Sequence, residues 1–281
     1  MTTRRRVTIT GANGQLGRAL RALCADSWEI DAPASAELEL RDWRAVRDRL
    51  AWFGPDLVIH AAAATDVDRC EREPDWAWGV NALGTRHVGR AAALAGAEFV
   101  HISTNYVFDG DASLPYHEFD APNPISVYGA SKLAGEREAL SASTRCYVVR
   151  TAWLYAEHGR NFVNTMRRVM ASQTTLRVVA DQVGNPTYAV DLALAITHVV
   201  ERGPYGIYHA VNAGEASWHR WAEEIALLDG RTTLSITPIE ASEYQRTATP
   251  PPNGALTSLA LPGLGIVLPD WRDALGRCLR S

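Results

Sequence analysis

The chain has 281 residues, of which 47% are hydrophobic and 21% are charged, a composition typical of an ordinary globular protein. Its formal net charge of -4 gives no electrostatic reason to expect nucleic acid or an anionic membrane as a partner. No apolar run approaches the length needed to cross a bilayer, so we expect no membrane segment and a cytoplasmic location. The cysteines are scattered and form no C-x-x-C pair, which favours buried thiols over disulfides or a metal site.

The first half of the chain alternates short apolar runs with segments of helical spacing. We predict strands at residues 7–10, 28–31, 57–60, 99–103 and 147–149. We predict helices at residues 15–25, 42–53 and 76–95, and a further helix that begins near Tyr128. Strands and helices in alternation are typical of βαβ units. The sequence therefore predicts an α/β fold with a Rossmann-type, doubly wound parallel sheet.

The second half of the chain has a more mixed pattern. Prolines and glycines predict loops over residues 110–124 and 249–254. The predicted helices are residues 161–170, 191–200 and 218–228, and the predicted strands are residues 177–179 and 207–209. We therefore predict a first domain over residues 1–150, joined by part of 176–200. A smaller C-terminal lobe would consist mainly of residues 151–281, interleaved with that domain.

Residues 11–17 form a G-x-x-G-x-x-G run between the first predicted strand and the first predicted helix. Glycines let the backbone approach a pyrophosphate closely, and the helix N-terminus presents free N–H groups to that anion. We therefore predict a dinucleotide site rather than a plain glycine turn. Asp31 ends the next predicted strand, where a carboxylate can accept hydrogen bonds from the adenosine ribose. It favours NADH because it repels a 2′-phosphate, but Arg18 or Arg41 could accommodate NADPH, so both cofactors stay open.

Tyr128 and Lys132 form a Y-x-x-x-K pair, which places both side chains on one face of a helix. Lys132 is the only lysine among 28 Lys and Arg residues, which indicates a position that requires an ammonium group. A neighbouring cation lowers the pKa of a phenol and so prepares it for proton exchange. Thr104 ends a predicted parallel strand, where such sheets open their ligand crevice.

These residues predict the reduction of a ketone rather than an exposed tyrosine and a solvated lysine. A nicotinamide would deliver hydride to the ketone carbon, and Tyr128 would donate a proton to the oxygen. Thr104 would orient that oxygen, and Lys132 would tune Tyr128 while it holds the cofactor.

Several longer segments, together with these motifs, resemble the dTDP-4-dehydrorhamnose reductase family of extended short-chain dehydrogenases/reductases. The segments are residues 61–71 (AAAATDVDRCE), 103–110 (STNYVFDG), 127–136 (VYGASKLAGE), 150–155 (RTAWLY), 161–166 (NFVNTM) and 181–187 (DQVGNPT). The resemblance implies that the first domain binds NADPH or NADH and that the lobe binds a dTDP-sugar. The implied reaction is reduction of the C4 ketone of dTDP-4-dehydro-L-rhamnose to dTDP-L-rhamnose.

The motifs and the resemblance together give a set of expected site residues. The expected catalytic residues are Thr104, Tyr128 and Lys132. The expected cofactor contacts are Gly11, Asn13, Gly14, Gln15, Leu16, Asp31, Glu39, Leu40, Ala61, Ala62, Ala63, Ala64, Thr65, Ile102, Tyr128 and Lys132. The expected substrate contacts are Thr104, Asn105 and Trp153, with packing in the core as the alternative for Trp153. No metal ion is expected, because no ligand spacing joins His60, His101, His117 and His158. His60 and His101, which lie on predicted strands, are expected to be core residues with satisfied hydrogen bonds.

Three positions depart from the family's pattern and bear on the substrate. Asn105 stands where the family usually has aspartate, so hydrogen-bonding capacity is kept while the charge is lost. Ala64 stands where a larger aromatic or imidazole ring is common. Residues 250–254, Pro-Pro-Pro-Asn-Gly, replace a usual Arg-Pro-x-Asn-Ser segment. These changes spare the residues for hydride transfer and leave the identity of the sugar open.

Two other functions stay open at the level of the sequence. One is the reduction of a C4 ketone on another dTDP-deoxysugar, which would use the same residues. The other is a non-catalytic subunit, resembling the regulatory subunit of methionine adenosyltransferase, that acts by binding a partner. A sugar-nucleotide dehydratase is disfavoured, because Asn105 and Tyr106 occupy the positions of its acid pair. A homodimer is also considered.

Overall fold

The computed structural model describes residues 4–231 and 233–280. A six-stranded sheet forms its centre, in the order β10-β5-β4-β3-β1-β2, and all neighbouring strands are parallel. The strands are β1 (Arg5–Thr10), β2 (Trp28–Asp31), β3 (Leu57–His60), β4 (Glu98–Thr104), β5 (Cys146–Thr151) and β10 (Gly206–His209). Every residue of β3 and β5 is buried, as expected for strands covered on both faces. The predicted Rossmann-type doubly wound sheet is confirmed.

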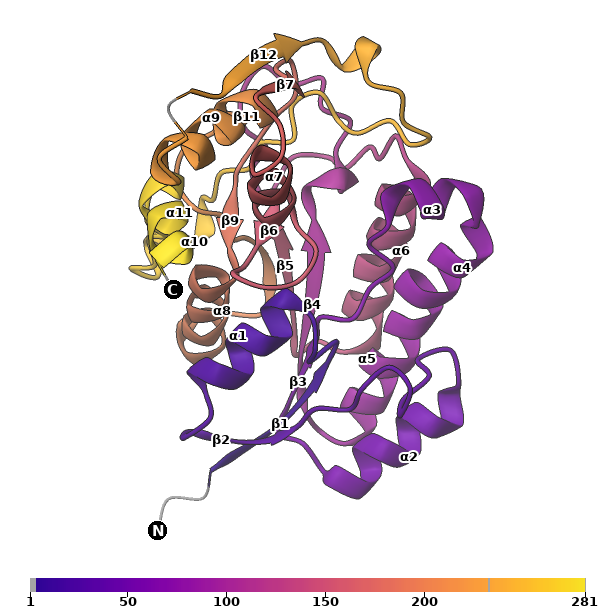
Figure 1. The fold of residues 1–281 in the computed structure, drawn as a ribbon. Helices are drawn as coiled ribbons and strands as arrows, with labels where there is room; N and C mark the ends of the chain where they lie inside the picture. Colours follow the sequence, from indigo (N-terminus) through magenta and orange to yellow (C-terminus); the bar gives the residue numbers. More distant parts are fainter. Residues whose placement is uncertain (1–3, 232, 281) are drawn as a thin grey trace.

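Helices cover both faces of this sheet (Figure 1). On one face, α1 (Gln15–Leu23) packs against α8 (Ala189–Arg202). The other face carries α2 (Trp43–Phe53), α5 (Thr85–Leu94) and α6 (Val127–Ala142). The strand order reverses at β1, which lies between β2 and β3. The carboxyl ends of β1 and β3 therefore border the crevice in which such sheets bind ligands.

A smaller lobe lies beyond one end of the sheet, at the top of Figure 1. Its strands pair as β7 (Thr175–Val179) with β12 (Ser235–Ile239), β8 (Val183–Gly184) with β11 (Ala216–Ser217), and β6 (Leu154–Tyr155) with β9 (Thr187–Tyr188). Its helices are α7 (Phe162–Met170), α9 (Trp218–Leu228) and α11 (Trp271–Arg280). Trp221 and Trp271 are fully buried in its core. The boundary near residue 150 stays a prediction, although α8 does return from the lobe to the sheet.

Some elements differ from those that the sequence predicts. The predicted helix over residues 76–95 consists of α4 (Pro74–Trp78), the π-helical turn η1 (Gly79–Gly84) and α5. The sequence does not predict α3 (Val67–Arg72), α10 (Ala260–Gly263), β12, α11 or the 3-10 turns η2 (Asn105–Val107) and η3 (Ala241–Glu243). α3 is too short for a periodic signal, and it begins where the Asp66 side chain accepts from the N–H of Arg69 at 3.0 Å. Residues 110–124 and 249–254 form loops, as predicted.

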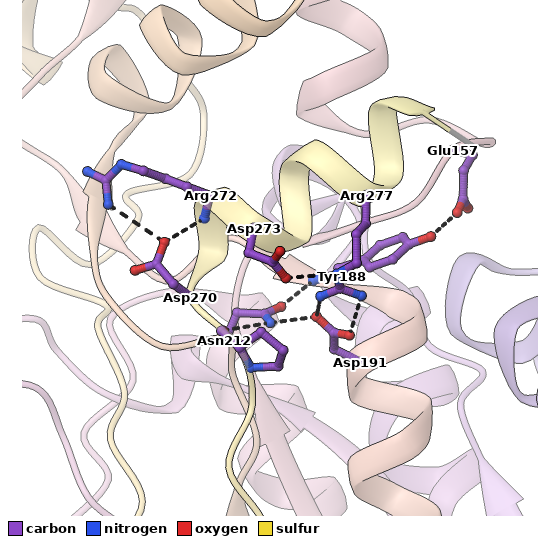
Figure 2. Close-up of polar contacts among 9 residues, drawn as sticks. Glu157, Tyr188, Asp191, Asn212, Asp270, Arg272, Asp273 and Arg277 are labelled. Carbon is purple, nitrogen blue, oxygen red and sulfur yellow. Dashed lines mark hydrogen bonds and ion pairs between the residues drawn. The ribbon is translucent and has the colours of Figure 1, made fainter.

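The C-terminal helix is fixed by a cluster of polar side chains around Arg277 (Figure 2). The guanidinium of Arg277 donates to both carboxylate oxygens of Asp191, at 2.8 and 2.6 Å, and to Asp273 at 2.9 Å. Asn212 donates to Asp191 at 2.7 Å and accepts from the backbone N–H of Tyr188 at 2.8 Å. Asp191 lies in the first turn of α8, so this cluster ties α11 to a helix that packs on the sheet.

The buried cysteines and histidines test further predictions. All four cysteines are buried free thiols, as predicted. His60 forms hydrogen bonds with Thr10 at 2.7 Å and Thr85 at 3.1 Å, as expected for a satisfied core histidine. The same expectation for His101 is wrong, because neither of its ring nitrogens has a hydrogen-bond partner among the described residues. The ring of His101 instead packs against those of His60 and Phe99, which also contact each other. Over the described ranges, no helix has the length and apolar character needed to span a membrane.

Candidate active site

The glycine run forms a tight turn between β1 and α1. The N–H of Gly14 donates to the carbonyl of Gly11 at 2.9 Å, and Gly11 has a φ of +70°. A Cβ atom on Gly11 would lie 2.6 Å from the backbone nitrogen of Ala62, and one on Gly17 would lie 2.5 Å from the Cα of Ala12. Only glycine therefore lets the loop, α1 and the segment after β3 pack together. No side chain of the described residues caps α1, which leaves its first N–H groups available to an anion.

A cavity of about 190 Å³ lies between this loop and the segment that follows β2. Its walls include Gly11, Asn13, Gly14, Leu40 and Ala62, which are all expected cofactor contacts. Further wall residues, which the sequence does not identify, are Pro33, Ala34, Ser35 and Leu38. A glycine-walled cavity at the N-terminus of a helix, beside the reversal of strand order, fits the pyrophosphate and adenosine of a dinucleotide.

The two acids expected near the adenosine are each paired with an arginine. Asp31, at the end of β2, is buried and forms an ion pair with Arg49 of α2. Glu39 accepts from Arg41 at 3.0 and 2.9 Å, and these hydrogen bonds lower the pKa of Glu39 to about 2. Neither carboxylate forms part of the cavity wall.

The remaining cofactor residues lie around the start of α1 and the end of β3. Gln15 accepts from the amide of Asn161 at 2.8 Å, which links the start of α1 to the lobe. The N–H of Ala64 donates to the side chain of Asn81 at 2.8 Å, and the Asn81 amide donates to Ser131 of α6 at 3.0 Å. Leu16 is buried, Ala61 and Ala63 are half-buried, and Thr65 is exposed. The sequence does not identify Asn81, although an asparagine inside a mostly apolar helical segment indicates a buried polar role.

The expected catalytic residues meet at the end of β4. The hydroxyl of Thr104 forms a hydrogen bond with the phenol of Tyr128, in the first turn of α6. One helical turn further, the ammonium of Lys132 donates to the carbonyl of Ile102 at 2.6 Å. The side chains of Thr104, Tyr128 and Lys132 are buried, and α6 begins at a Ser126 hydroxyl that accepts from a backbone N–H at 3.1 Å. The structure therefore brings Thr104, Tyr128, Lys132 and Ile102 together.

Burial is the main influence on the pKa values of Tyr128 and Lys132. It raises the pKa of Tyr128, while the hydrogen bond with Thr104 acts in the opposite direction. This is opposite to the lowering that the sequence predicts from a neighbouring ammonium. Burial also lowers the pKa of Lys132 to about 8, against the attraction of the Glu136 carboxylate. Tyr128 therefore keeps its proton at neutral pH, which is the form that a proton donor needs.

A buried ion pair supports the catalytic residues from behind. Glu136, one turn after Lys132, accepts from Arg150 of β5 at 2.9 and 2.7 Å. It also accepts from the hydroxyl of Ser103 at 2.5 Å, directly before Thr104. The pair thus joins β4, α6 and β5. The sequence holds a signal for this pair, because Arg150 directly follows the predicted apolar strand 147–149. An arginine that is buried there must have a partner.

A larger cavity of about 790 Å³ lies next to the catalytic residues and extends along the lobe. Tyr106 belongs to its wall and contacts the ring of Tyr128 edge-on, with 5.2 Å between centroids. Three arginines also line it: Arg160, Arg177 and Arg246. With Asp68 and Asp181 also in its wall, the cavity offers three guanidinium groups, two carboxylates and aromatic surface beside the phenol.

Trp153 lies behind this cavity in an aromatic stack. Its ring is 3.6 Å from that of Trp218, centroid to centroid, with an interplanar angle of 12°, and Trp218 lines the cavity. Trp153 has a φ of +43°, the only positive value at a non-glycine position in the described part of the chain. A Cβ atom on Gly184 would lie 2.5 Å from its indole ring. Packing therefore holds Trp153 in a strained backbone conformation near the site.

Comparison with known proteins assigns the chain to a family. A family model described as the RmlD substrate binding domain matches residues 5–281. The chain is 41% identical over 275 residues to the dTDP-4-dehydrorhamnose reductase of Mycolicibacterium smegmatis, covering 96% of this chain and 84% of that protein. The chain belongs to the dTDP-4-dehydrorhamnose reductase family. The resemblance drawn from the sequence is confirmed.

Other relatives of this reductase family agree. The spore coat polysaccharide biosynthesis protein SpsK of Bacillus subtilis is 38% identical over 277 residues, which covers 98% of this chain and 97% of SpsK. The solved dTDP-4-dehydrorhamnose reductase of Bacillus anthracis, in complex with NADP, is 38% identical with a TM-score of 0.96. The match covers 99% of each chain. The fold of the family therefore extends over the whole length described.

Two departures from the reductase family's pattern lie in contact with each other. The amide of Asn105 donates to the carbonyl of Gly254 at 2.9 Å, and Asn105 is buried. A Cβ atom on Gly254 would collide with that same amide nitrogen. Asparagine supplies the donor that this contact needs, whereas an ionised aspartate has none. The contact thus requires both an amide at position 105 and a glycine at position 254.

Proposed function

We propose that the protein reduces the C4 ketone of dTDP-4-dehydro-L-rhamnose to dTDP-L-rhamnose, with NADPH or NADH as cofactor. The observation that carries the proposal is the buried phenol of Tyr128, which is hydrogen-bonded to Thr104 and lies one helical turn from the only lysine. Thr104 ends β4, which is separated in the sheet by β3 alone from β1 and the glycine loop that follows it. The relative from Mycolicibacterium smegmatis, named for this reaction, supports the choice of sugar.

The side chains have distinct tasks in this reaction. When bound, the reduced nicotinamide supplies the hydride that adds to C4 of the sugar. Tyr128 donates its proton to the ketone oxygen as negative charge develops there, and the hydroxyl of Thr104 orients the same oxygen. The ammonium of Lys132, anchored on the carbonyl of Ile102 at 2.6 Å, keeps further N–H donors for ribose hydroxyls. The ketone thereby becomes a secondary alcohol.

The larger cavity would hold the rest of the sugar nucleotide. It begins at Tyr106, next to the catalytic phenol, and extends toward the ring of Trp218. Guanidinium groups bind phosphate oxygens in a bidentate manner, so the arginines of its wall suit a diphosphate. Trp218, stacked on Trp153, offers a flat apolar surface to a ring. We expect Asn105 and Trp153 to lie on the sugar side of this cavity.

A 4-ketoreductase that acts on another dTDP-deoxysugar is the second candidate. The contact between Asn105 and Gly254 favours it, because a neutral amide directly after Thr104 takes the place of the aspartate that the family usually has. A non-catalytic regulatory subunit would leave the assembled Thr104, Tyr128 and Lys132 without a task. We further propose a cytoplasmic location, a homodimer, and no nucleic-acid or membrane partner; light scattering after size-exclusion chromatography tests the dimer.

The experiment is reduced-nicotinamide oxidation with enzymatically generated dTDP-4-dehydro-L-rhamnose, run with NADPH and NADH in parallel, with the product identified by NMR. We expect dTDP-L-rhamnose from the wild type. Tyr128→Phe keeps the ring but loses the proton, so turnover should fall by about 10²-fold or more while cofactor binding persists. Tyr205→Phe, at a half-exposed tyrosine paired with Glu98 at 2.8 Å, is the matched control. Near wild-type turnover of Tyr128→Phe would remove this residue from the mechanism.

A further inference from the structure

Both acids near the expected adenosine site are neutralised within the chain. Asp31 pairs with Arg49, and Glu39 pairs with Arg41. The wall of the 190 Å³ cavity holds glycines, apolar residues, Thr10, Asn13 and Ser35, and neither carboxylate belongs to it. Each charge that would repel a 2′-phosphate is therefore balanced by an arginine.

The pair between Asp31 and Arg49 is the more enclosed of the two. The side chain of Asp31 is 5% exposed, whereas that of Glu39 is 53% exposed. Nε of Arg49 donates to Oδ2 of Asp31 at 3.1 Å, and Nη2 of Arg49 donates to Oδ1. The hydroxyl of Thr8 approaches Oδ2 from β1, at 3.5 Å. Both carboxylate oxygens are thus engaged by the protein, which leaves Asp31 little capacity to accept from a ribose.

A hollow that carries three arginines lies next to Ala32, which follows Asp31 in the chain. This open hollow has a volume of about 610 Å³. The charged residues of this hollow are Arg4, Arg18, Arg21 and Glu29. Arg18 donates to the carbonyl of Asn13 at 3.0 Å, and Arg21 donates to the side chain of Asn13 at 3.4 Å. Two guanidinium groups of this hollow therefore lie beside the glycine loop.

We propose that Arg49 sets the cofactor preference by holding the Asp31 carboxylate, so that the site admits the 2′-phosphate of NADPH as well as the 2′-hydroxyl of NADH. The inference rests on the proposed cofactor site and goes beyond it. The sequence alone assigns Asp31 to the ribose and so favours NADH. Without Arg49, the negative charge of the carboxylate has no partner and its oxygens are free to accept hydrogen bonds, so the site selects NADH.

Calorimetric titration of the full chain with NADPH and with NADH, at fixed ionic strength, tests the proposal without reference to turnover. For the wild type we expect the two Kd values to lie within about tenfold of each other. Arg49→Met should weaken NADPH binding by about tenfold or more and change the Kd of NADH by less than about threefold. Adding Asp31→Asn to Arg49→Met removes the freed charge and should restore NADPH binding.

Arg47→Met is the matched control. Arg47 lies on the same helix, is exposed and pairs with its neighbour Asp48, so both Kd values should stay unchanged. Equal weakening of both cofactors in Arg49→Met would overturn the proposal, and so would a double variant that does not regain NADPH binding. A wild type that prefers NADH by much more than tenfold would also overturn it. A wild type that binds neither cofactor would instead refute the proposed function itself.

Discussion

Replacing Glu136 by glutamine removes a buried charge behind the catalytic residues while it keeps the size of the side chain. The carboxylate of Glu136 accepts from Ser103 at 2.5 Å and from Arg150 at 2.9 and 2.7 Å. The side chains of Arg150 and Glu136 are only 2% and 3% exposed. A glutamine would direct its NH₂ group at one of these N–H or O–H donors. The guanidinium would then be buried without a balancing charge.

The cost of this change is expected to be large. Breaking a buried ion pair by removing one partner costs about 3–5 kcal/mol of the free energy of unfolding. His209, 3.4 Å from Arg150, cannot supply a compensating negative charge, because its ring is either neutral or positive, and burial lowers its pKa so that it is neutral at neutral pH. Arg86 and Glu138 form the corresponding exposed pair on α5 and α6, with 2.6 Å between nitrogen and oxygen. Exposed pairs contribute about 1 kcal/mol or less.

Urea unfolding followed by far-UV circular dichroism compares Glu136→Gln with Glu138→Gln on the same helix. We expect Glu136→Gln to lose at least about 2 kcal/mol more than Glu138→Gln, from the two ranges above. Its turnover should also fall, because Ser103, which directly precedes Thr104, would share with Arg150 the one acceptor oxygen that glutamine retains. Equal stability of the two variants would refute the reasoning, since it would mean that burial does not govern the strength of the pair.

Two further predictions concern Lys132 and the glycine loop. Because burial lowers the pKa of Lys132 to about 8, its ammonium is lost as the pH rises through that value, and kcat/KM should decline on the alkaline side. A profile that stays flat to about pH 9.5 would contradict a charged Lys132 in the reaction. Gly17→Ala places a Cβ atom 2.5 Å from the Cα of Ala12, so the loop must shift and cofactor affinity should fall by about tenfold or more. Gly263→Ala is the control, because no atom lies within 4 Å of the added Cβ atom, and it should bind the cofactor normally. Normal cofactor affinity of Gly17→Ala, measured by calorimetry, would contradict the prediction.

Much of the site could be predicted because its residues act through local geometry. The glycine run must form a turn wherever it lies, and the spacing of Tyr128 and Lys132 puts both on one helical face. Thr104 ends a strand, and the carboxyl ends of parallel strands border one crevice. Asn81 and Glu136 were missed as partners because their importance depends on what lies opposite them: Ala64 for the first and Arg150 for the second.

The electrostatics of the site could not be predicted in the same way. The sequence suggests that Lys132 lowers the pKa of Tyr128, yet burial raises it. It assigns Asp31 to a ribose, yet Arg49, eighteen residues later, takes both carboxylate oxygens. Burial and ion pairing depend on which elements pack together, and no local sequence pattern encodes those contacts.

The sequence by itself determined the parallel sheet, the glycine turn, the family and which residues to propose as catalytic, because periodicity, glycine and residue spacing act over a few positions. Tertiary structure alone decided which charges meet. It paired Asp31 with Arg49 and Glu136 with Arg150, and it brought Asn105 against Gly254, 149 residues away. These contacts join segments that are distant in the chain, and their strength depends on the exclusion of water, which only the packed fold produces.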